Sequence, residues 1–324
     1  MLSEKQKKWY AGKAVLVTGA DGFIGSHLVA ALIESGAEVS VTVHREDKAT
    51  RVKPFLNAVE VFEGDLSEEG VARSIIQTSK PKIIFNAASS TNTAPDFSAL
   101  DDVLKNTYGI AHAMLQAATE SSVERFVQFG SIAEYGLAQA PFTEDMHEMP
   151  QTPYALGKVM ATLSTFAIGR MTDMEVVVVR PAAVYGPGQG FTMLVPNLIK
   201  ACLEKKDFDM NKGEQLRDFI FIDDLVEGIL AVGSSENSTG EIFNLGSGNP
   251  TLVKEVATMV NAALGNPITI NFGAQPYREG DSMEFYMDST KAKHILGWTA
   301  STDIKTAIEK TIQWYRENTD RVKH

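Results

Sequence analysis

Three side chains of this sequence have the types and spacing that proton transfer at a carbon-bound oxygen requires. Tyr154 and Lys158 stand at positions i and i+4 in Tyr154-Ala-Leu-Gly-Lys158, and Ser131 precedes them. In a helix these two positions share one face, so the Lys158 ammonium should lie beside the Tyr154 ring. A cation there favours the phenolate and brings the pKa of the phenol, ordinarily about 10, toward neutrality. With Ser131 holding the oxygen of a carbonyl or carbinol, the three groups fit acid/base catalysis of hydride transfer beside a dinucleotide.

A glycine-rich turn upstream offers a place for such a dinucleotide. The segment from Lys13 to Leu28 reads as a buried apolar strand, a tight turn and the first turns of a helix. Its spacing is Gly-x-x-Gly-x-x-Gly: Gly19 permits the sharp turn, Gly22 lets the backbone approach a pyrophosphate, and Gly25 lets helix and strand pack closely. The phosphates should lie at the positive end of the helix.

Further blocks distributed over essentially the whole chain resemble the extended short-chain dehydrogenase/reductase family. That family holds nucleotide-sugar epimerases, dehydratases and 4-ketoreductases. The blocks are Thr18-Gly-Ala-Asp-Gly-Phe-Ile-Gly25, Gly64-Asp-Leu66, Asn86-Ala-Ala88, Asn106-Thr-Tyr-Gly109, Gly130-Ser-Ile-Ala-Glu-Tyr-Gly136, Pro153-Tyr-Ala-Leu-Gly-Lys158, Arg180-Pro-Ala-Ala-Val-Tyr-Gly-Pro187 and Arg217-Asp-Phe-Ile-Phe-Ile-Asp-Asp224.

The resemblance implies two sets of binding residues. Cofactor contacts are expected from the glycine turn, the ends of later strands and the catalytic helix: Gly19, Gly22, Phe23, Ile24, Gly25, His44, Arg45, Asp65, Leu66, Ala87, Ala88, Asn106, Tyr154 and Lys158. Substrate contacts are expected from Ser131, Ile132, Arg217 and Arg278, the two arginines holding a nucleotide diphosphate. Simpler roles stay open: Asp65 could cap a helix, Asn106 could be a polar helix residue, and either arginine could form a surface ion pair.

The choice of nicotinamide cofactor depends on the end of the second predicted strand. NAD enzymes of this kind usually carry an acidic residue there for the ribose hydroxyl, whereas this chain has His44 and Arg45. A guanidinium can pair with a 2′-phosphate that a carboxylate would repel, so the sequence favours NADP(H), with NAD as the alternative. Arg45 could also simply point into solvent.

Departures from the family patterns narrow the expected reaction. Ile132 and Ala133 follow Ser131 where sugar 4,6-dehydratases have acidic residues, which argues against dehydration. Ala183 replaces an asparagine that many epimerases direct to the substrate phosphate, and Glu134 is similar to a glutamate of GDP-sugar 4-ketoreductases. The first expectation is therefore reduction of a nucleotide-diphospho-4-keto-6-deoxyhexose, with Tyr154 as the general acid. An epimerase with tightly held NAD and a non-catalytic, cofactor-sensing member of the fold are the alternatives.

The hydrophobic pattern predicts an α/β fold of the Rossmann type with a doubly wound parallel sheet. Apolar strands alternate with helices, and the regular alternation ends near Arg180, which suggests a dinucleotide-binding domain over 1–180 and a smaller α/β substrate lobe over 181–324, with segments returning to the core. The expected strands are Ala14–Thr18, Val39–Val43, Val59–Phe62, Ile83–Phe85, Phe126–Phe129 and Val176–Val179. The expected helices are Ile24–Ser35, Glu68–Thr78, Ala99–Glu120 and Pro153–Arg170.

Composition bounds the setting of the protein. The 324 residues are 44% hydrophobic and carry a net charge of -11, which argues against a nucleic-acid or anionic-membrane partner. A single cysteine, Cys202, excludes an intrachain disulfide, and neither an apolar signal segment nor a membrane-length apolar run is present, so a cytoplasmic protein is expected. Scattered histidines predict no metal site. By analogy with the family, the helices Ala99–Glu120 and Pro153–Arg170 should form a four-helix contact in a homodimer.

Overall fold

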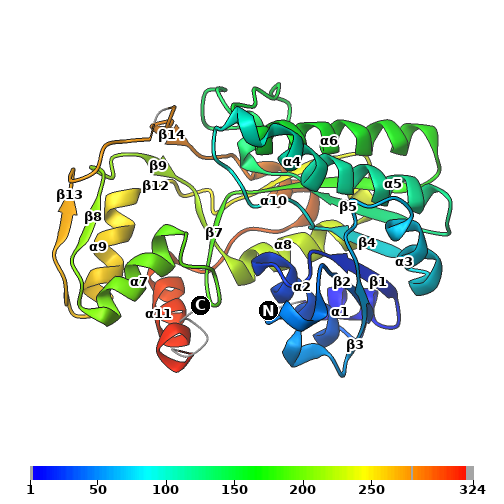
Figure 1. Cartoon of the computed structure of the whole chain (residues 1–324), viewed down its shortest axis with the longest axis horizontal. Helices are drawn as coiled ribbons and strands as arrows, with labels where there is room; N and C mark the ends of the chain where they lie inside the picture. Colours follow the sequence, from blue (N-terminus) through cyan, green and yellow to red (C-terminus); the bar gives the residue numbers. More distant parts are fainter. Residues whose placement is uncertain (1–2, 279, 319–324) are drawn as a thin grey trace.

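A seven-stranded parallel sheet forms the larger part of the molecule in the computed structural model, which describes residues 3–278 and 280–318 (Figure 1). Its strand order is β3-β2-β1-β4-β5-β6-β11, with the direction of winding reversed between β1 and β4. This is the Rossmann order, and it opens a crevice at the carboxyl ends of the strands where the winding reverses. The strands are β1 (Ala14–Thr18), β2 (Glu38–Val43), β3 (Val59–Glu63), β4 (Ile83–Asn86), β5 (Arg125–Phe129), β6 (Glu175–Pro181) and β11 (Ile242–Leu245).

Helices cover both faces of this sheet because its apolar side chains alternate between two cores. Val15 and Val17 of β1 belong to one buried cluster, and Leu16 between them belongs to the other. Helices α2 (Phe23–Glu34) and α8 pack together on the first face, and α3 and α5 pack together on the second. The remaining bounds are α1 (Glu4–Tyr10), α3 (Val71–Ser79), α4 (Leu100–Leu104), α5 (Ile110–Thr119), α6 (Pro153–Met171) and α8 (Ile222–Ser234).

The predicted strands all occur in the sheet, whereas one predicted helix differs from its expected form. The continuous helix expected over Ala99–Glu120 is interrupted by a π-helical turn, η4 (Lys105–Gly109), between α4 and α5. The backbone carbonyl of Asn106 in this turn accepts a hydrogen bond from the Ser90 amide at 2.8 Å. The turn therefore ties the helix to the loop after β4, a tertiary contact that helical periodicity does not encode.

Smaller sheets and helices from the second half of the chain form the other part of the molecule, at the left of Figure 1. Two-stranded sheets join β7 to β10 and β8 to β13, and a three-stranded sheet has the order β12-β9-β14. The strands are β7 (Ala183–Tyr185), β8 (Phe208–Met210), β9 (Leu216–Arg217), β10 (Phe219–Phe221), β12 (Thr251–Leu252), β13 (Ile270–Phe272) and β14 (Glu284–Phe285). The helices are α7 (Leu194–Glu204), α9 (Val253–Ala263) and α11 (Ile304–Glu317), whereas α10 (Thr290–Leu296) packs against β11 and α8 of the larger part.

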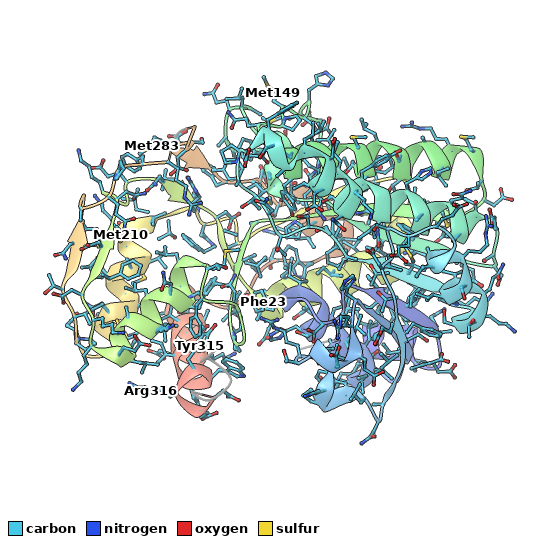
Figure 2. The ribbon with its side chains drawn as sticks, in the orientation of Figure 1. Phe23, Met149, Met210, Met283, Tyr315 and Arg316 are labelled. Atoms are coloured by element: carbon cyan, nitrogen blue, oxygen red, sulfur yellow. The ribbon has the colours of Figure 1, made fainter. Side chains whose placement is uncertain are left out.

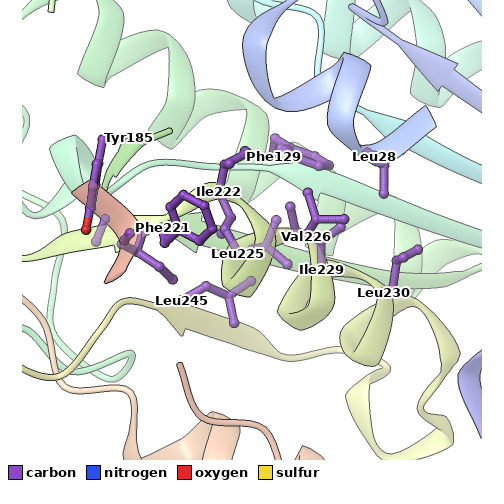
Figure 3. Packing of buried hydrophobic residues seen from close by; sticks show 14 of the residues in the cluster. Leu28, Phe129, Tyr185, Phe221, Ile222, Leu225, Val226, Ile229, Leu230 and Leu245 are labelled. Atoms are coloured by element: carbon purple, nitrogen blue, oxygen red, sulfur yellow. The ribbon is translucent and has the colours of Figure 1, made fainter. Parts of the chain in front are cut away.

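The chain crosses between the two parts more than once after Pro181. Helix α8 and strand β11 return to the large sheet, where Leu225, Ile229 and Leu245 pack in the same buried cluster as Phe129 of β5 (Figure 3). That cluster also includes Leu198 of α7 and Ile312 of α11. One continuous core thus holds the smaller part against the sheet, and the walls of the space between them are set by packing.

Among the described residues, none of the helices combines the length and the apolar character that a bilayer crossing demands.

Candidate active site

A cleft of about 1470 Å³ runs between the large sheet and the smaller part. Phe23 at the start of α2 and Met210 at the end of β8 both line the cleft. In Figure 2, Met210 lies at the left, in the smaller part, and Phe23 lies near the centre, beside the large sheet. A pocket for one small molecule typically measures about 300–1,000 Å³, roughly a fifth to two thirds of this volume. The cleft is therefore large enough for a dinucleotide together with a second ligand.

The glycine turn forms one wall of the cleft and has the strain that its sequence predicts. Gly19 has φ +64°, and a Cβ there would come within 2.8 Å of the Ala88 backbone. A Cβ on Gly25 would lie 2.2 Å from the Gly19 carbonyl oxygen, so the turn and α2 can meet only through glycine. Gly22 is the N-cap of α2 and no side chain caps the helix, which leaves amide groups of the first turn available to an anion.

Most residues expected to bind a cofactor line this cleft. These are Gly19, Gly22, Phe23, Ile24, Gly25, His44, Asp65, Leu66, Ala87, Ala88, Asn106, Tyr154 and Lys158. Asp65 makes an Asx-type turn, accepting from the Ser67 amide at 2.9 Å, rather than capping α3, which begins at Val71. Asn106 lines the cleft and also donates a hydrogen bond to the Asp102 carbonyl at 2.9 Å. It is therefore both a cleft residue and a polar residue bonded within its own helix.

Arg45 and Ile132 do not line the cleft, unlike the other candidates. Arg45 is exposed and forms two hydrogen bonds with Asp47, at 2.8 and 3.0 Å. This ion pair occupies the guanidinium that was expected to meet a 2′-phosphate, which weakens the sequence argument for NADP. The side chain of Ile132 is buried in the hydrophobic core, because η5 (Ile132–Tyr135) turns it inward.

Three elements bring the catalytic candidates together. Helix α6 begins with Thr152 as its N-cap, which places Tyr154 in the first turn and Lys158 one turn later. Ser131 follows the end of β5 as the N-cap of η5, where its Oγ accepts from the Ala133 amide at 3.1 Å. The Ser131 hydroxyl also lies near enough to the Tyr154 phenol to lower its pKa. All three side chains line the same cleft as the glycine turn.

The electrostatics of Tyr154 and Lys158 differ from the sequence-based expectation. Burial raises the pKa of Tyr154 to about 12, outweighing the opposite effect of hydrogen bonds with Ser131 and Ser89. Burial also lowers the pKa of Lys158 to about 8. The Lys158 Nζ lies 5.7 Å from the centre of the Tyr154 ring and donates to the Phe129 carbonyl at 2.8 Å. Among the protein's own groups desolvation dominates, so the phenol is protonated at neutral pH rather than prepared as phenolate.

Glu134 is not directed toward the cleft, so its likeness to a reductase glutamate gives no substrate contact. The side chain is fully buried and bonds Arg180, which is also fully buried, at 2.8 Å. It accepts from the Ser131 amide at 2.7 Å as well, completing a capping box for η5. Glu134 therefore does not line the cleft, and its likeness to a reductase glutamate stays a prediction.

The two arginines expected to hold a diphosphate both line the cleft, in different states. Arg217 of β9 is partly buried and pairs with Asp281 at 2.5 Å, and Gln215 donates to the same carboxylate at 2.8 Å. Arg278 is exposed at the rim. An anion entering the cleft would compete with Asp281 for Arg217.

Ser89 is a site residue that the sequence analysis missed. It lines the cleft three residues after the end of β4 and lowers the pKa of the Tyr154 phenol, so hydroxyl groups from two neighbouring strand ends act on the phenol. The available signal was its place directly after Asn86-Ala-Ala88, because ligands of such sheets lie at the carboxyl ends of the strands. Other polar residues that line the cleft without having been predicted include Ser90, Thr91, Thr93, Gln189, Asn197 and Gln275.

The described residues contain no cluster of three or more His, Cys, Asp or Glu side chains placed to hold a metal ion.

Comparison with known proteins agrees with this geometry. The sequence profile of the NAD dependent epimerase/dehydratase family matches residues 15–246. A UDP-glucose 4-epimerase from Mycolicibacterium smegmatis is 29% identical, over 93% of this chain and 98% of its own length. A human dTDP-D-glucose 4,6-dehydratase is 28% identical, over 94% and 91%. The structure of an epimerase from Methanothermobacter thermautotrophicus superposes with a TM-score of 0.89 at 27% identity, covering 98% of this chain and 96% of that one.

Proposed function

Because the chain belongs to the NAD dependent epimerase/dehydratase family, we propose that it is a nucleotide-sugar 4-epimerase with a retained nicotinamide cofactor. The observation that carries the proposal is the convergence of Ser131, Tyr154 and Lys158 on one wall of a cleft that also contains the glycine turn. The likeness to a UDP-glucose 4-epimerase supports this reaction over the 4-keto reduction that the sequence alone favoured.

Each catalytic residue has a distinct task in this reaction. A bound nicotinamide would take the hydride from C4 of the hexose and return it to the opposite face. Tyr154 in its phenolate form accepts the proton of the C4 hydroxyl during oxidation and gives it back to the oxygen during re-reduction, so the proton balance closes within one turnover. Ser131 donates to the same oxygen, and the Lys158 charge favours the phenolate once the oxidised, positively charged cofactor is also present. Arg217 and Arg278 hold the diphosphate.

Dehydration fits the site less well. A 4,6-dehydratase needs acidic residues after the catalytic serine to eliminate water, and here those positions are Ile132, buried in the core, and Ala133, a methyl group at the cleft wall. Neither can transfer a proton. The human dehydratase is therefore a relative whose named reaction we do not assign to this chain.

Net reduction of a nucleotide-diphospho-4-keto-6-deoxyhexose by NADPH remains a second candidate on one observation. Strand β2 ends at Val43, and the next residue, His44, lines the cleft where a carboxylate for the NAD ribose would stand. Both the lack of a carboxylate there and the protonated phenol suit a reductase. The Arg45–Asp47 ion pair and the likeness to the UDP-glucose 4-epimerase favour the epimerase.

Absorbance of the reduced nicotinamide separates the two reactions. Purified protein should be incubated with UDP-glucose or UDP-galactose, and with a nucleotide-diphospho-4-keto-6-deoxyhexose plus NADPH. An epimerase interconverts the first pair at constant absorbance, whereas a reductase consumes one NADPH per keto sugar. Stoichiometric loss of NADPH with no interconversion of the hexoses would replace the first proposal by the second.

We also propose a homodimer in which α4, α5 and α6 of two copies pack together. Leu163 and Met171 of α6 are 57% and 78% exposed, which is unusual for large apolar side chains on one helix. Light scattering at micromolar concentration should give twice the mass of the chain, and a monomer would refute this assembly without affecting the chemistry.

A further inference from the structure

The fully buried carboxylate of Glu134 lies directly behind the proposed catalytic serine, and the mechanism above does not use it. One oxygen accepts from the Ser131 amide at 2.7 Å. The other accepts from the Thr162 hydroxyl at 2.8 Å and from Arg180 at 2.8 and 3.1 Å. Thr162 belongs to α6, the helix that carries Tyr154 and Lys158. A single carboxylate therefore joins the Ser131 backbone, the catalytic helix and the β6 arginine.

The charges around Glu134 exceed what its pairing with Arg180 requires. Arg180 also pairs with Glu148 at 2.6 Å, so two carboxylates surround one guanidinium. Glu134, Glu148 and Arg180 together leave one negative charge in excess. The side chain of Lys158, which is 3% exposed, supplies one positive charge. Opposite buried charges offset part of one another's desolvation cost, so the excess carboxylate charge partly compensates the buried ammonium.

We propose that Glu134 is a positioning residue, which fixes the backbone of Ser131 toward Tyr154 and supplies the counter-charge for the Lys158 ammonium. The positioning role rests on the proposed function, because it is defined by what Ser131 and Lys158 do there. A capping role alone would need only the hydrogen bond to the Ser131 amide. The additional bonds join the Glu134 carboxylate to Thr162 of α6 and to Arg180 of β6.

The electrostatics of Lys158 agree with this arrangement. Burial is the largest influence and lowers its pKa to about 8, and Glu134 is the charge that acts in the opposite direction. Within the described part of the chain, the titratable groups that act on Lys158 are Tyr154 on its own helix and Glu134 on η5, which is paired with Arg180 of β6. Removing the Glu134 charge should therefore move the Lys158 pKa further down and leave more neutral amine near pH 8.

Direct titration of Lys158 tests the charge role without any substrate. In protein labelled at lysine Nζ, the Lys158 resonance is assigned by its loss in Lys158→Met, and its midpoint is compared in Glu134→Gln, Glu134→Asp and Glu148→Gln. We expect a fall of about 0.5 unit or more in Glu134→Gln. Glu134→Asp should stay near wild type because it keeps the charge, and Glu148→Gln should lower the midpoint less than Glu134→Gln does, because Glu148 is joined to this cluster only through Arg180. An unchanged midpoint in Glu134→Gln overturns the charge role.

Kinetics test the positioning role. Glu134→Gln should lower kcat about tenfold with little change in KM, and the alkaline limb of its pH profile should move to lower pH. Glu134→Asp should keep the alkaline limb of the pH profile at its wild-type position, because the charge remains. Its kcat should be lower than that of wild type, because the shorter side chain cannot accept the hydrogen bond from the Ser131 amide. If Glu134→Gln does not fold, Glu134→Asp decides: wild-type kcat in that variant refutes positioning. A wild-type protein inactive on every nucleotide sugar refutes the proposed function instead, and the titration still judges the charge role.

Discussion

The Lys158 ammonium lies 5.7 Å from the centre of the Tyr154 ring, yet its hydrogen bond goes to the carbonyl of Phe129 and not to the phenol. Burial acts on both groups and drives them toward their neutral forms, with the pKa of the lysine lowered and that of the tyrosine raised. The protein's own groups thus set the site for proton donation. Base catalysis requires a further positive charge, which an oxidised nicotinamide would bring.

Lys158→Met should stabilise the protein while reducing activity. The folded-state pKa of Lys158, about 8, is below its ordinary value of 10.5, so the folded state disfavours the charged form and wild-type stability rises with pH between these values. At pH 7 the free energy of unfolding of the variant should be higher than that of wild type by on the order of 1–2 kcal/mol. This is less than the full pKa shift of Lys158 implies, because the Phe129 carbonyl loses its hydrogen-bond donor. The gain should shrink above pH 8. Chemical denaturation across this range measures it, and a variant less stable than wild type at pH 7 would contradict the argument.

Tyr154→Phe should remove the acid/base group and leave the cleft intact. The ring still packs on α6, but no proton can be transferred to the substrate oxygen, so kcat should fall about 10²- to 10⁴-fold. Cofactor affinity, measured by fluorescence titration, should change little and serves as the control. Turnover near that of wild type would refute the catalytic role of the phenol.

Ser89→Ala should have a smaller effect of the same kind. The Ser89 hydroxyl lowers the pKa of Tyr154, so its loss should raise that pKa further and make the phenolate harder to form. One neutral hydrogen bond is worth about 1 kcal/mol, which predicts a two- to tenfold loss of kcat. The acidic limb of the oxidation rate should move to higher pH. Ser90→Ala is a matched control, and an equal loss in both variants would argue against a specific contact with the phenol.

Asp281→Asn should improve the binding of nucleoside diphosphates. Asp281 occupies Arg217 at 2.5 Å in the ligand-free cleft, and a diphosphate must displace it. Removing this competing charge should lower the Kd of UDP about threefold or more, whereas Arg217→Ala should raise it at least about tenfold. Calorimetry measures both, and unchanged affinity in Asp281→Asn would mean that the ligand does not use Arg217.

Arg45→Ala should barely alter the preference between NADPH and NADH. The Arg45 side chain is 52% exposed, lies outside the cleft lining and pairs with Asp47. We expect a change of less than about threefold in the ratio of the two Kd values, because an exposed ion pair contributes about 0–1 kcal/mol. A larger loss of NADPH affinity would show that Arg45 leaves Asp47 to bind the 2′-phosphate, and would strengthen the reductase alternative.

The sequence by itself determined the parallel sheet, the glycine turn and the spacing of the candidate catalytic residues. Each of these features depends on a few neighbouring residues. They are the alternating apolar residues of β1, the glycines at positions 19 and 25, and the spacing of Tyr154 and Lys158. Local rules of this kind can be read from the chain.

The tertiary structure decided what depends on contacts between distant segments. Ser89 meets Tyr154, Glu134 turns to Arg180, and Arg217 pairs with Asp281 only after separate elements have packed together. The pKa directions of Tyr154 and Lys158 were likewise settled by burial, which the i, i+4 spacing does not reveal. Desolvation is a property of everything packed around a group, so its size becomes known only with the whole fold.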